Sequence, residues 1–178
     1  MSRRLVLVLG GTRSGKSRFG LARARELSDG TPVTYLATAR AGDAELDDRI
    51  ARHRRARPAS WPTVEVGDDL AAAIRATEPK ATLLLDGLTL WLSAVAGDEP
   101  ADVDAILDGP FARALEAIRQ RPGAVVVVSD ELGLGMVPLS PVGRAFRDLQ
   151  GMAHQRLATD ADEVHFLVAG LPLTLRDR

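Results

Sequence analysis

A glycine-rich pattern near the start of the chain has the residues that bind nucleotide phosphates. The pattern G-x-x-x-x-G-K-S runs from Gly10 to Ser17. Gly10 and Gly15 allow backbone angles that side chains forbid, so backbone N–H groups can close on phosphate oxygens. Lys16 can reach the β- and γ-phosphates, and the Ser17 hydroxyl can take one site on Mg²⁺. These residues predict a P-loop, whose chemistry is the binding and transfer of phosphoryl groups.

The sequence around this pattern is the context that a P-loop requires. An apolar, β-branched run at 5–9 precedes it and is long enough for one buried strand. Residues 17–27 favour a helix, with Phe19, Ala22 and Leu27 spaced for one buried face. A helix that begins here adds its dipole and free N–H groups to the phosphate site. The alternative is a simple glycine turn, and the agreement of pattern and context disfavours it.

Two acids at the ends of later apolar runs are candidates to hold Mg²⁺. Asp86 ends the run LLLD, and Asp130 ends the run VVVVSD, with Glu131 after it. Because ligands in parallel α/β sheets bind beyond the carboxyl ends of the strands, we expect Gly10, Thr38, Asp86 and Asp130 at one edge. The pattern alone does not choose between the two acids. The alternative for either is a helix cap, since Asp is favoured where a strand leads into a helix.

His53 lies in a polar, arginine-rich helical segment. Arg49 precedes it by four residues and Arg57 follows it by four, so the three lie near one helix face. A solvated basic face is the ordinary interpretation. The functional interpretation is a phosphate-handling site, in which arginines bind phosphate and keep the imidazole unprotonated and nucleophilic. We expect His154 and His165 to be packing or surface residues, and the histidine spacing does not favour a zinc site.

Composition limits the function classes. The chain has 178 residues and a net charge of −1, so we expect no broad electrostatic attraction to nucleic acid or membrane. It has no cysteine, which excludes disulfides, thiolate metal sites and thiol nucleophiles. No run approaches the roughly 20 apolar residues of a membrane span, and the run at 5–9 is too short for a signal peptide. We expect a cytoplasmic protein.

Apolar runs alternate with helical segments along the chain. We expect strands at 5–9, 33–37, 63–66, 81–85, 124–129 and 164–169. We expect helices at 17–27, 43–56, 70–77, 88–95, 103–119 and 142–159, and a short tail at 170–178. This alternation predicts an α/β fold, with a mostly parallel, P-loop NTPase-like sheet and helices on both faces. We find no repeat or linker and expect a single domain over residues 1–178.

Several segments are similar to those of one enzyme family. They are GGTRSGKSRF at 10–19, YLAT at 35–38, RIARHRRARPASW at 49–61, LLLDGLTLW at 83–91, SDELGLGMVP at 129–138 and the segment 146–173. They follow the family's order over nearly the whole chain, and the histidine segment is far more specific than the P-loop. On these motifs the chain resembles the bifunctional adenosylcobinamide kinase/adenosylcobinamide-phosphate guanylyltransferase family of cobalamin biosynthesis.

The resemblance implies two reactions. The first phosphorylates the aminopropanol hydroxyl of adenosylcobinamide with ATP or GTP. The second transfers GMP from GTP to that phosphate, which releases pyrophosphate and gives adenosylcobinamide-GDP. In the family the GMP passes through a covalent phosphoramidate on the motif histidine, here His53. His53 and Lys16 are therefore the expected catalytic residues, and the P-loop adds Mg²⁺ as the expected cofactor.

The resemblance also implies a nucleotide site, residue by residue. The expected phosphate-binding residues are Gly10, Gly11, Thr12, Arg13, Ser14, Gly15, Lys16 and Ser17. The other expected nucleotide-site residues are Leu36, Ala37, Thr38, Arg54, Arg55, Ala56, Arg57, Glu65 and Asp86. The resemblance favours Asp86 over Asp130, with Ser17 and Asp86 as the expected Mg²⁺ ligands. It leaves the role of Glu131 open.

One position departs from the family pattern. The late helix usually reads G-x-x-N-Q, and His154 stands here in place of the asparagine. A histidine can donate a hydrogen bond there, with a different reach and a dependence on pH. The family also forms trimers whose subunits share the site, so the resemblance implies a homo-oligomer, and specifically a trimer.

Two other functions stand as alternatives. A plain P-loop small-molecule kinase would transfer the γ-phosphoryl group without forming a nucleotidyl-enzyme. A non-catalytic GTP-binding module would bind GTP and turn over no cobinamide. A covalent GMP adduct on the protein separates both from the two reactions of the family.

Overall fold

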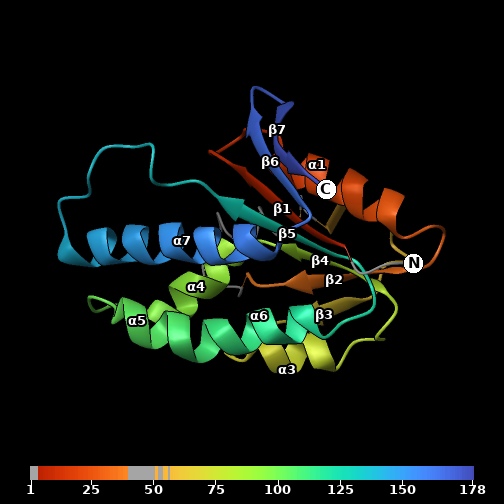
Figure 1. The fold of residues 1–178 in the computed structure, drawn as a ribbon, viewed down its shortest axis with the longest axis horizontal. Coiled ribbons are helices and arrows are strands. Elements are labelled where there is room, and N and C mark those ends of the chain that lie inside the picture. The colour runs from red at the N-terminus through yellow and green to blue at the C-terminus, as the bar shows by residue number, and fades with distance from the viewer. Residues whose placement is uncertain (1–3, 40–50, 52–53, 56) are drawn as a thin grey trace.

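A mostly parallel β-sheet forms the centre of the fold (Figure 1). The computed structural model describes residues 4–39, 51, 54–55 and 57–178. The strands are β1 (Leu5–Gly10), β2 (Val33–Ala37), β3 (Thr63–Glu65), β4 (Thr82–Asp86), β5 (Val125–Asp130), β6 (Glu163–Val168) and β7 (Leu171–Asp177). Within the described residues they pair in the order β3-β2-β4-β5-β1-β6-β7. All neighbours are parallel except β7, which runs antiparallel to β6.

Helices cover both faces of this sheet. They are α1 (Lys16–Leu27), α3 (Leu70–Arg75), α4 (Leu88–Ala96), α5 (Val103–Ile106), α6 (Ala112–Arg119) and α7 (Pro141–Asp160), with a π-helical turn η1 (Leu107–Phe111) between α5 and α6. α1 lies on one face, and α3, α4, α6 and α7 lie on the other (Figure 1). The predicted α/β fold is therefore confirmed. None of the described helices is both long and apolar enough to cross a membrane.

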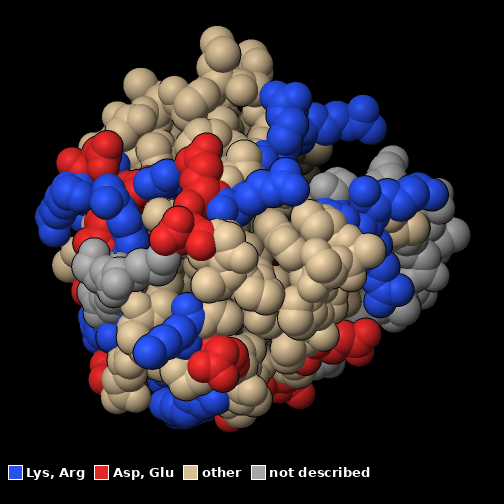
Figure 2. All heavy atoms as spheres, turned by 90° about the vertical axis from the view of Figure 1, so that its right-hand side faces the viewer, with Lys and Arg blue, Asp and Glu red and all other residues tan. Residues whose placement is uncertain are grey.

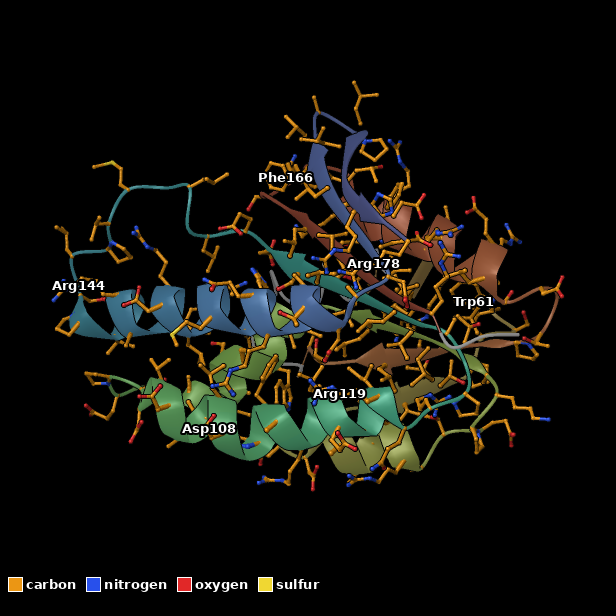
Figure 3. All side chains as sticks on the ribbon, in the orientation of Figure 1. Trp61, Asp108, Arg119, Arg144, Phe166 and Arg178 are labelled. Carbon is orange, nitrogen blue, oxygen red and sulfur yellow. The ribbon has the colours of Figure 1, made fainter. Side chains whose placement is uncertain are left out.

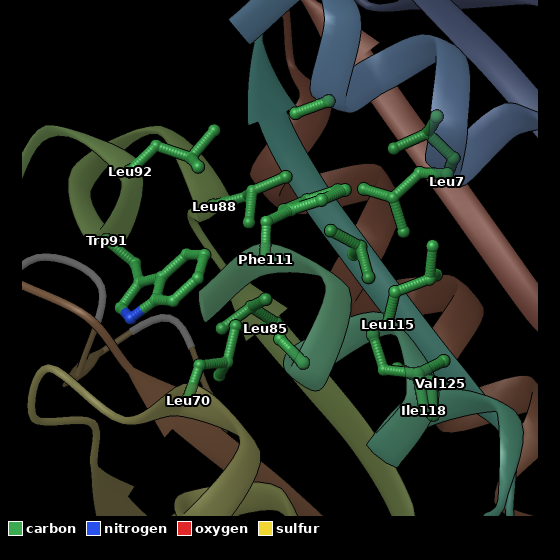
Figure 4. Packing of buried hydrophobic residues seen from close by; sticks show 14 of the residues in the cluster. Leu7, Leu70, Leu85, Leu88, Trp91, Leu92, Phe111, Leu115, Ile118 and Val125 are labelled. Carbon is green, nitrogen blue, oxygen red and sulfur yellow. The ribbon is translucent and has the colours of Figure 1, made fainter. Parts of the chain in front are cut away.

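Alternate side chains of the strands build two hydrophobic cores. Along β1, Leu7 points into the core under α4, α6 and α7, whereas Val6 and Val8 point into the core under α1. Figure 4 shows the first core, in which Leu85 and Phe111 come from opposite sides of the interface between sheet and helices. Strands buried on both faces need apolar residues at every position, which explains the unbroken apolar runs of the sequence.

Gly20 allows α1 to lie close to the sheet. A Cβ atom at this position would lie 2.5 Å from Cγ2 of Val128 in β5. A larger residue would therefore push the helix away from the strand. Because α1 begins at the end of the glycine loop, this contact also fixes the loop relative to the end of β5.

The expected short tail at 170–178 is wrong, because Leu171–Asp177 forms the edge strand β7. Ala169, with φ 53°, and Gly170, with φ 81°, turn the chain back onto β6, as tight hairpin turns require. Every second residue from Leu171 to Leu175 is apolar, but these side chains are more than half exposed. Alternating apolar residues that pack against no core are only a weak indication of a strand.

The expected helix at 103–119 is interrupted. The π-helical turn η1 separates α5 from α6, and Gly109 in this turn has a non-helical conformation. Pro110 follows it and has no N–H with which to continue an α-helical ladder. The helix expected at 43–56 lies largely outside the described residues.

Acidic and basic side chains are interspersed on the side of the molecule shown in Figure 2. One charged cluster, around Glu163, is largely buried. The carboxylate of Glu163, only 2% exposed, lies 2.5 Å from Nη2 of Arg23, 2.6 Å from Nε of Arg4 and 3.1 Å from Nε2 of His165. Burial by itself raises the pKa of Glu163. The hydrogen bonds from Arg23 and His165 and the charges of Arg23 and Arg4 outweigh burial and lower this pKa from 4.5 to about 2.

Glu163→Gln removes this carboxylate and leaves the basic side chains without their shared partner. We expect the free energy of unfolding at pH 7 to fall by about 1.5–3 kcal/mol, the range for hydrogen bonds to charged groups. Because folding lowers the pKa of Glu163, its stabilisation is complete above about pH 4.5 and is lost as the pH falls toward 2. Urea unfolding between pH 7 and pH 3 should therefore show a difference from wild type that shrinks with the pH.

Glu99→Gln is the matched control, since Glu99 is exposed in a loop. It should leave the free energy of unfolding close to that of wild type throughout this range. A Glu163→Gln difference that stays constant from pH 7 to pH 3 would contradict the assigned ionisation.

Candidate functional site

The carboxyl ends of four parallel strands meet at one edge of the sheet. Gly10 of β1 is in register with Asp130 of β5, and Ala37 of β2 is in register with Asp86 of β4. Figure 1 shows this edge on the left, where β5 leads into the long connection to α7. The fold thus brings the glycine loop and both candidate acids to the same edge, as parallel α/β sheets do for their ligands.

The loop Gly10–Ser17 has the tight backbone that its glycines allow. Gly15 has φ 95° and is the N-cap of α1. A Cβ atom at Gly10 would lie 2.5 Å from Oγ of Ser14. The Gly170 N–H donates to the Ser14 carbonyl at 2.9 Å and ties the loop to the β6–β7 turn. The loop therefore leads directly into a helix amino end, which favours anions.

Lys16 begins α1 and is only 8% exposed. Its Nζ lies 2.6 Å from Oδ1 of Asp130 and donates to the Gly11 carbonyl at 3.2 Å. A buried ammonium group is costly unless oxygen atoms replace its water. The pairing with Asp130 and Gly11 therefore holds the Lys16 charge in place at the end of β5.

Ser17 pairs with the other candidate acid. Its hydroxyl donates to Oδ1 of Asp86 at 3.2 Å. The Tyr35 hydroxyl donates to the backbone carbonyl of Asp86 at 3.2 Å and lies 3.4 Å from its Oδ2. The two acids thus have different partners in the loop, because Asp86 meets Ser17 and Asp130 meets Lys16.

Tyr35 connects Asp86 with the arginine-rich segment. The Arg57 guanidinium lies over the Tyr35 ring, 3.9 Å from its centroid, and donates to the Thr63 hydroxyl at 2.8 Å. Burial and then the charge of Asp86 raise the pKa of Tyr35, which keeps its hydroxyl protonated and able to donate. Sequence reasoning missed Tyr35, although it is the chain's one tyrosine and lies in the quoted segment YLAT.

The other expected nucleotide-site residues take different positions. The side chain of Leu36 is fully buried in the core, so only its backbone reaches the edge. The Thr38 hydroxyl donates to the Gly87 carbonyl at 2.8 Å and accepts from the Gly87 N–H at 3.2 Å. Glu65 is exposed and in register with Ala37. The expected residues that are also exposed are Thr12, Arg13, Arg54 and Arg55. His53 and Ala56 lie outside the described residues.

A buried polar network holds the end of β5. The Gln150 side-chain amide, from α7, donates to the Asp130 carbonyl at 2.5 Å and to the Thr89 hydroxyl at 2.8 Å. The Thr89 hydroxyl accepts from the Asp130 N–H at 2.8 Å and lies 3.2 Å from the Ser129 hydroxyl. Sequence reasoning missed Gln150 and Thr89. The one available signal was a polar residue among the largely apolar residues of a helix.

His154 packs against the same strand and is buried, so of the two expected alternatives, packing or surface, the structure shows packing. Its Nε2 lies 2.8 Å from the Ser129 Oγ, and its Nδ1 lies 3.6 Å from Oε2 of Glu131. Burial lowers the pKa of His154, and the nearby charge of Glu131 opposes this more weakly. The imidazole is therefore neutral at pH 7. Among the described residues, no group of three or more His, Cys, Asp or Glu side chains is arranged to hold a metal ion.

Two solved structures have a similar fold. An ATPase domain matches with a TM-score of 0.53 and 18% identity, covering 92% of this chain and 69% of that chain. The flagellar accessory protein FlaH from Methanocaldococcus jannaschii also has a TM-score of 0.53, with 12% identity, covering 98% of this chain and 79% of that chain. At these identities the similarity shows the fold alone.

Sequence comparisons are more specific. Bifunctional adenosylcobalamin biosynthesis protein CobP of Pseudomonas aeruginosa is 45% identical over 172 residues, covering 96% of each chain. The corresponding protein CobU of Escherichia coli is 34% identical over 183 residues, covering 97% of this chain and 99% of the relative. The family described as "Cobinamide kinase / cobinamide phosphate guanyltransferase" matches residues 6–175. With the P-loop, its two acids and these matches in agreement, the chain belongs to the cobinamide kinase/cobinamide phosphate guanylyltransferase family.

Proposed function

We propose that the sheet edge carrying Lys16 and Ser17 serves both reactions of this family. The chain is a bifunctional cobinamide kinase and cobinamide phosphate guanylyltransferase of adenosylcobalamin biosynthesis. One observation carries the proposed site: each of the two P-loop side chains meets a strand-end carboxylate, Asp130 for Lys16 and Asp86 for Ser17. Phosphoryl transfer depends mainly on such positioned charges.

In the kinase step, the backbone of Gly10–Ser17 holds the phosphates of ATP or GTP. Lys16 neutralises the charge that develops on the transferred phosphoryl group. Ala37 and Thr38 border the nucleotide at the end of β2, and Arg57 lies beyond them. The aminopropanol hydroxyl of adenosylcobinamide attacks the γ-phosphorus, and the nucleoside diphosphate leaves.

We assign Mg²⁺ to Ser17 and Asp86. Hydroxyl and carboxylate oxygens are the hard ligands that Mg²⁺ prefers, and these two lie 3.2 Å apart. Mg²⁺ usually binds one or two carboxylates together with substrate phosphates and water, so few protein ligands suffice. When bound, the ion offsets phosphate charge, and the Tyr35 hydroxyl, 3.4 Å from Oδ2 of Asp86, keeps this carboxylate oriented toward Ser17.

We assign the covalent intermediate to His53. Arg57, four residues later, stacks on Tyr35, whose hydroxyl bonds to Asp86. This contact supports the assignment because it ties the end of the histidine segment to the nucleotide edge. The His53 imidazole attacks the α-phosphorus of GTP and pyrophosphate leaves. A phosphate oxygen of adenosylcobinamide phosphate then displaces the histidine and gives adenosylcobinamide-GDP.

We also infer that residues 1–178 act as one domain and that the protein is a homo-oligomer, by resemblance a trimer. The connection between β5 and α7 supports the oligomer, since Met136 and Leu139 are 94% and 97% exposed there. Large exposed apolar side chains mark interaction surfaces. Arg144, at the start of α7 in Figure 3, donates to the carbonyls of Pro138 and Leu139 at 3.1 and 2.7 Å and holds this connection. A cytoplasmic location stays a prediction from composition.

Asp86→Asn tests the Mg²⁺ assignment. The amide keeps the shape of the side chain but removes the charge that attracts the ion, so we expect Mg²⁺ to enhance GTP binding about tenfold less than in wild type. Calorimetric titration with GTP in the presence and absence of Mg²⁺ measures this difference. Asp98→Asn, at an exposed loop position, is the matched control. An unchanged Mg²⁺ dependence in Asp86→Asn would transfer the metal role to another acid.

His53→Asn tests the covalent intermediate. Wild-type protein incubated with α-³²P-GTP and Mg²⁺ should carry label on the peptide that contains His53, labile to acid and stable to base, because a phosphoramidate forms there. The variant should remain unlabelled and transfer no GMP, yet still phosphorylate adenosylcobinamide, since that step forms no adduct on the histidine. A denaturing gel followed by peptide mapping locates the label.

Incubation with γ-³²P-GTP is the control, because that label leaves with pyrophosphate and should not appear on the peptide. GMP transfer by His53→Asn at the wild-type rate would remove His53 from the mechanism. Wild-type protein that binds GTP but acquires no label would instead favour a plain kinase or a binding module.

A further inference from the structure

Asp130 lies next to the position that the transferred phosphoryl group must take. Its Oδ1 is 2.6 Å from Nζ of Lys16, and the P-loop lysine reaches the β- and γ-phosphates of the nucleotide. Lys16 is therefore a common neighbour of the Asp130 carboxylate and the γ-phosphoryl group. The Asp130 side chain is 20% exposed, so an acceptor can approach it from solvent.

Asp86 and Glu131, two other described acids at this edge, already have partners. The Asp86 Oδ1 accepts from Ser17, and its Oδ2 faces the Tyr35 hydroxyl. The Glu131 Oε1 accepts the Gly133 N–H at 2.6 Å, and its Oε2 faces His154. Within the described part of the chain, Asp130 pairs with Lys16 through Oδ1, which leaves carboxylate oxygen available for an incoming donor.

The backbone of Asp130 is held from three sides. Its N–H donates to Thr89, its carbonyl accepts from Gln150, and the next N–H, that of Glu131, donates to the Gly10 carbonyl at 3.0 Å. The last bond ties it to the first residue of the P-loop. A proton acceptor must lie within hydrogen-bond reach of the reacting group and must be held there by its supports. These bonds supply that support.

We propose that Asp130 is the general base of the kinase step. As the cobinamide hydroxyl oxygen attacks the γ-phosphorus, a new O–P bond forms and the bond from the γ-phosphorus to the β–γ bridging oxygen breaks. The bridging oxygen keeps the electron pair and leaves with the nucleoside diphosphate. The hydroxyl proton passes to the Asp130 carboxylate and then to solvent. This inference rests on the proposed function, because it requires the nucleotide phosphates to lie at Lys16.

The second reaction, GMP transfer, does not require a general base to remove a proton from the acceptor. Its acceptor is a phosphate monoester, whose second pKa is about 6, so its attacking oxygen is already ionised at neutral pH. An alcohol acceptor must lose a proton, whereas this acceptor has none to lose. Asp130 should therefore serve phosphorylation and be dispensable for GMP transfer.

Asp130→Asn separates the two half-reactions. We expect kcat for phosphorylation of adenosylcobinamide to fall by about 10²–10⁴-fold, the usual contribution of a general base. GMP transfer from GTP to adenosylcobinamide phosphate supplied directly should stay close to wild type in the same preparation, because the amide oxygen of asparagine can still accept a hydrogen bond from Lys16. GTP affinity, measured by equilibrium dialysis, should not weaken. Asp29→Asn is the matched control, since Asp29 is exposed beyond the far end of α1 and asparagine accepts its positive φ of 46°.

Three results would overturn the inference. Asp130→Asn could phosphorylate adenosylcobinamide at the wild-type rate, which would leave no role for the carboxylate in proton removal. It could lose both half-reactions together, or it could lose GTP binding, and either result would limit the role of Asp130 to the support of Lys16. Failure of the proposed function is distinct, because wild-type protein would then turn over neither acceptor.

Discussion

The pairing of the Lys16 ammonium with the Asp130 carboxylate is the contact on which the functional edge depends. Lys16 is only 8% exposed, so its ammonium group needs oxygen partners. Asp130 can be such a partner because β5 lies directly beside β1. The glycine at position 20 lets α1 sit against β5, which keeps the start of that helix near the strand end. The strand order, the packing of α1 and the geometry of the glycine loop therefore together position the Lys16–Asp130 pair.

The same strand order gives the two acids different partners. β4 follows β5 in the sheet, so Asp86 lies one strand beyond Asp130 and meets Ser17 rather than Lys16. Asp86 thus lies beside the Ser17 hydroxyl, and Asp130 lies beside the Lys16 ammonium group. In the proposed mechanism Asp86 serves both reactions. Asp130 serves only the phosphorylation, whose acceptor is an alcohol.

The features that depend on neighbouring residues in the sequence could be predicted from the sequence. The P-loop follows from its glycines and from its strand and helix neighbours, and the buried strands follow from unbroken apolar runs. The choice between Asp86 and Asp130 could not follow from pattern, because each is an aspartate at the end of an apolar strand and only strand order separates their partners. Gln150 and Thr89 were missed since their role comes from a contact between α7 and β5 that is distant in sequence. β7 was missed because its apolar side chains face no core.

The most direct test of this account is the effect of Lys16→Ala on both half-reactions, measured side by side with Mg²⁺ and GTP. Because the proposed mechanism uses one ammonium group to stabilise the phosphates in both steps, we expect both rates to fall by about a hundredfold or more. Lys80→Ala removes the other lysine of the chain, which is exposed, and should leave both rates unchanged. A Lys16→Ala variant that retained either reaction at the wild-type rate would contradict a single P-loop site for the two.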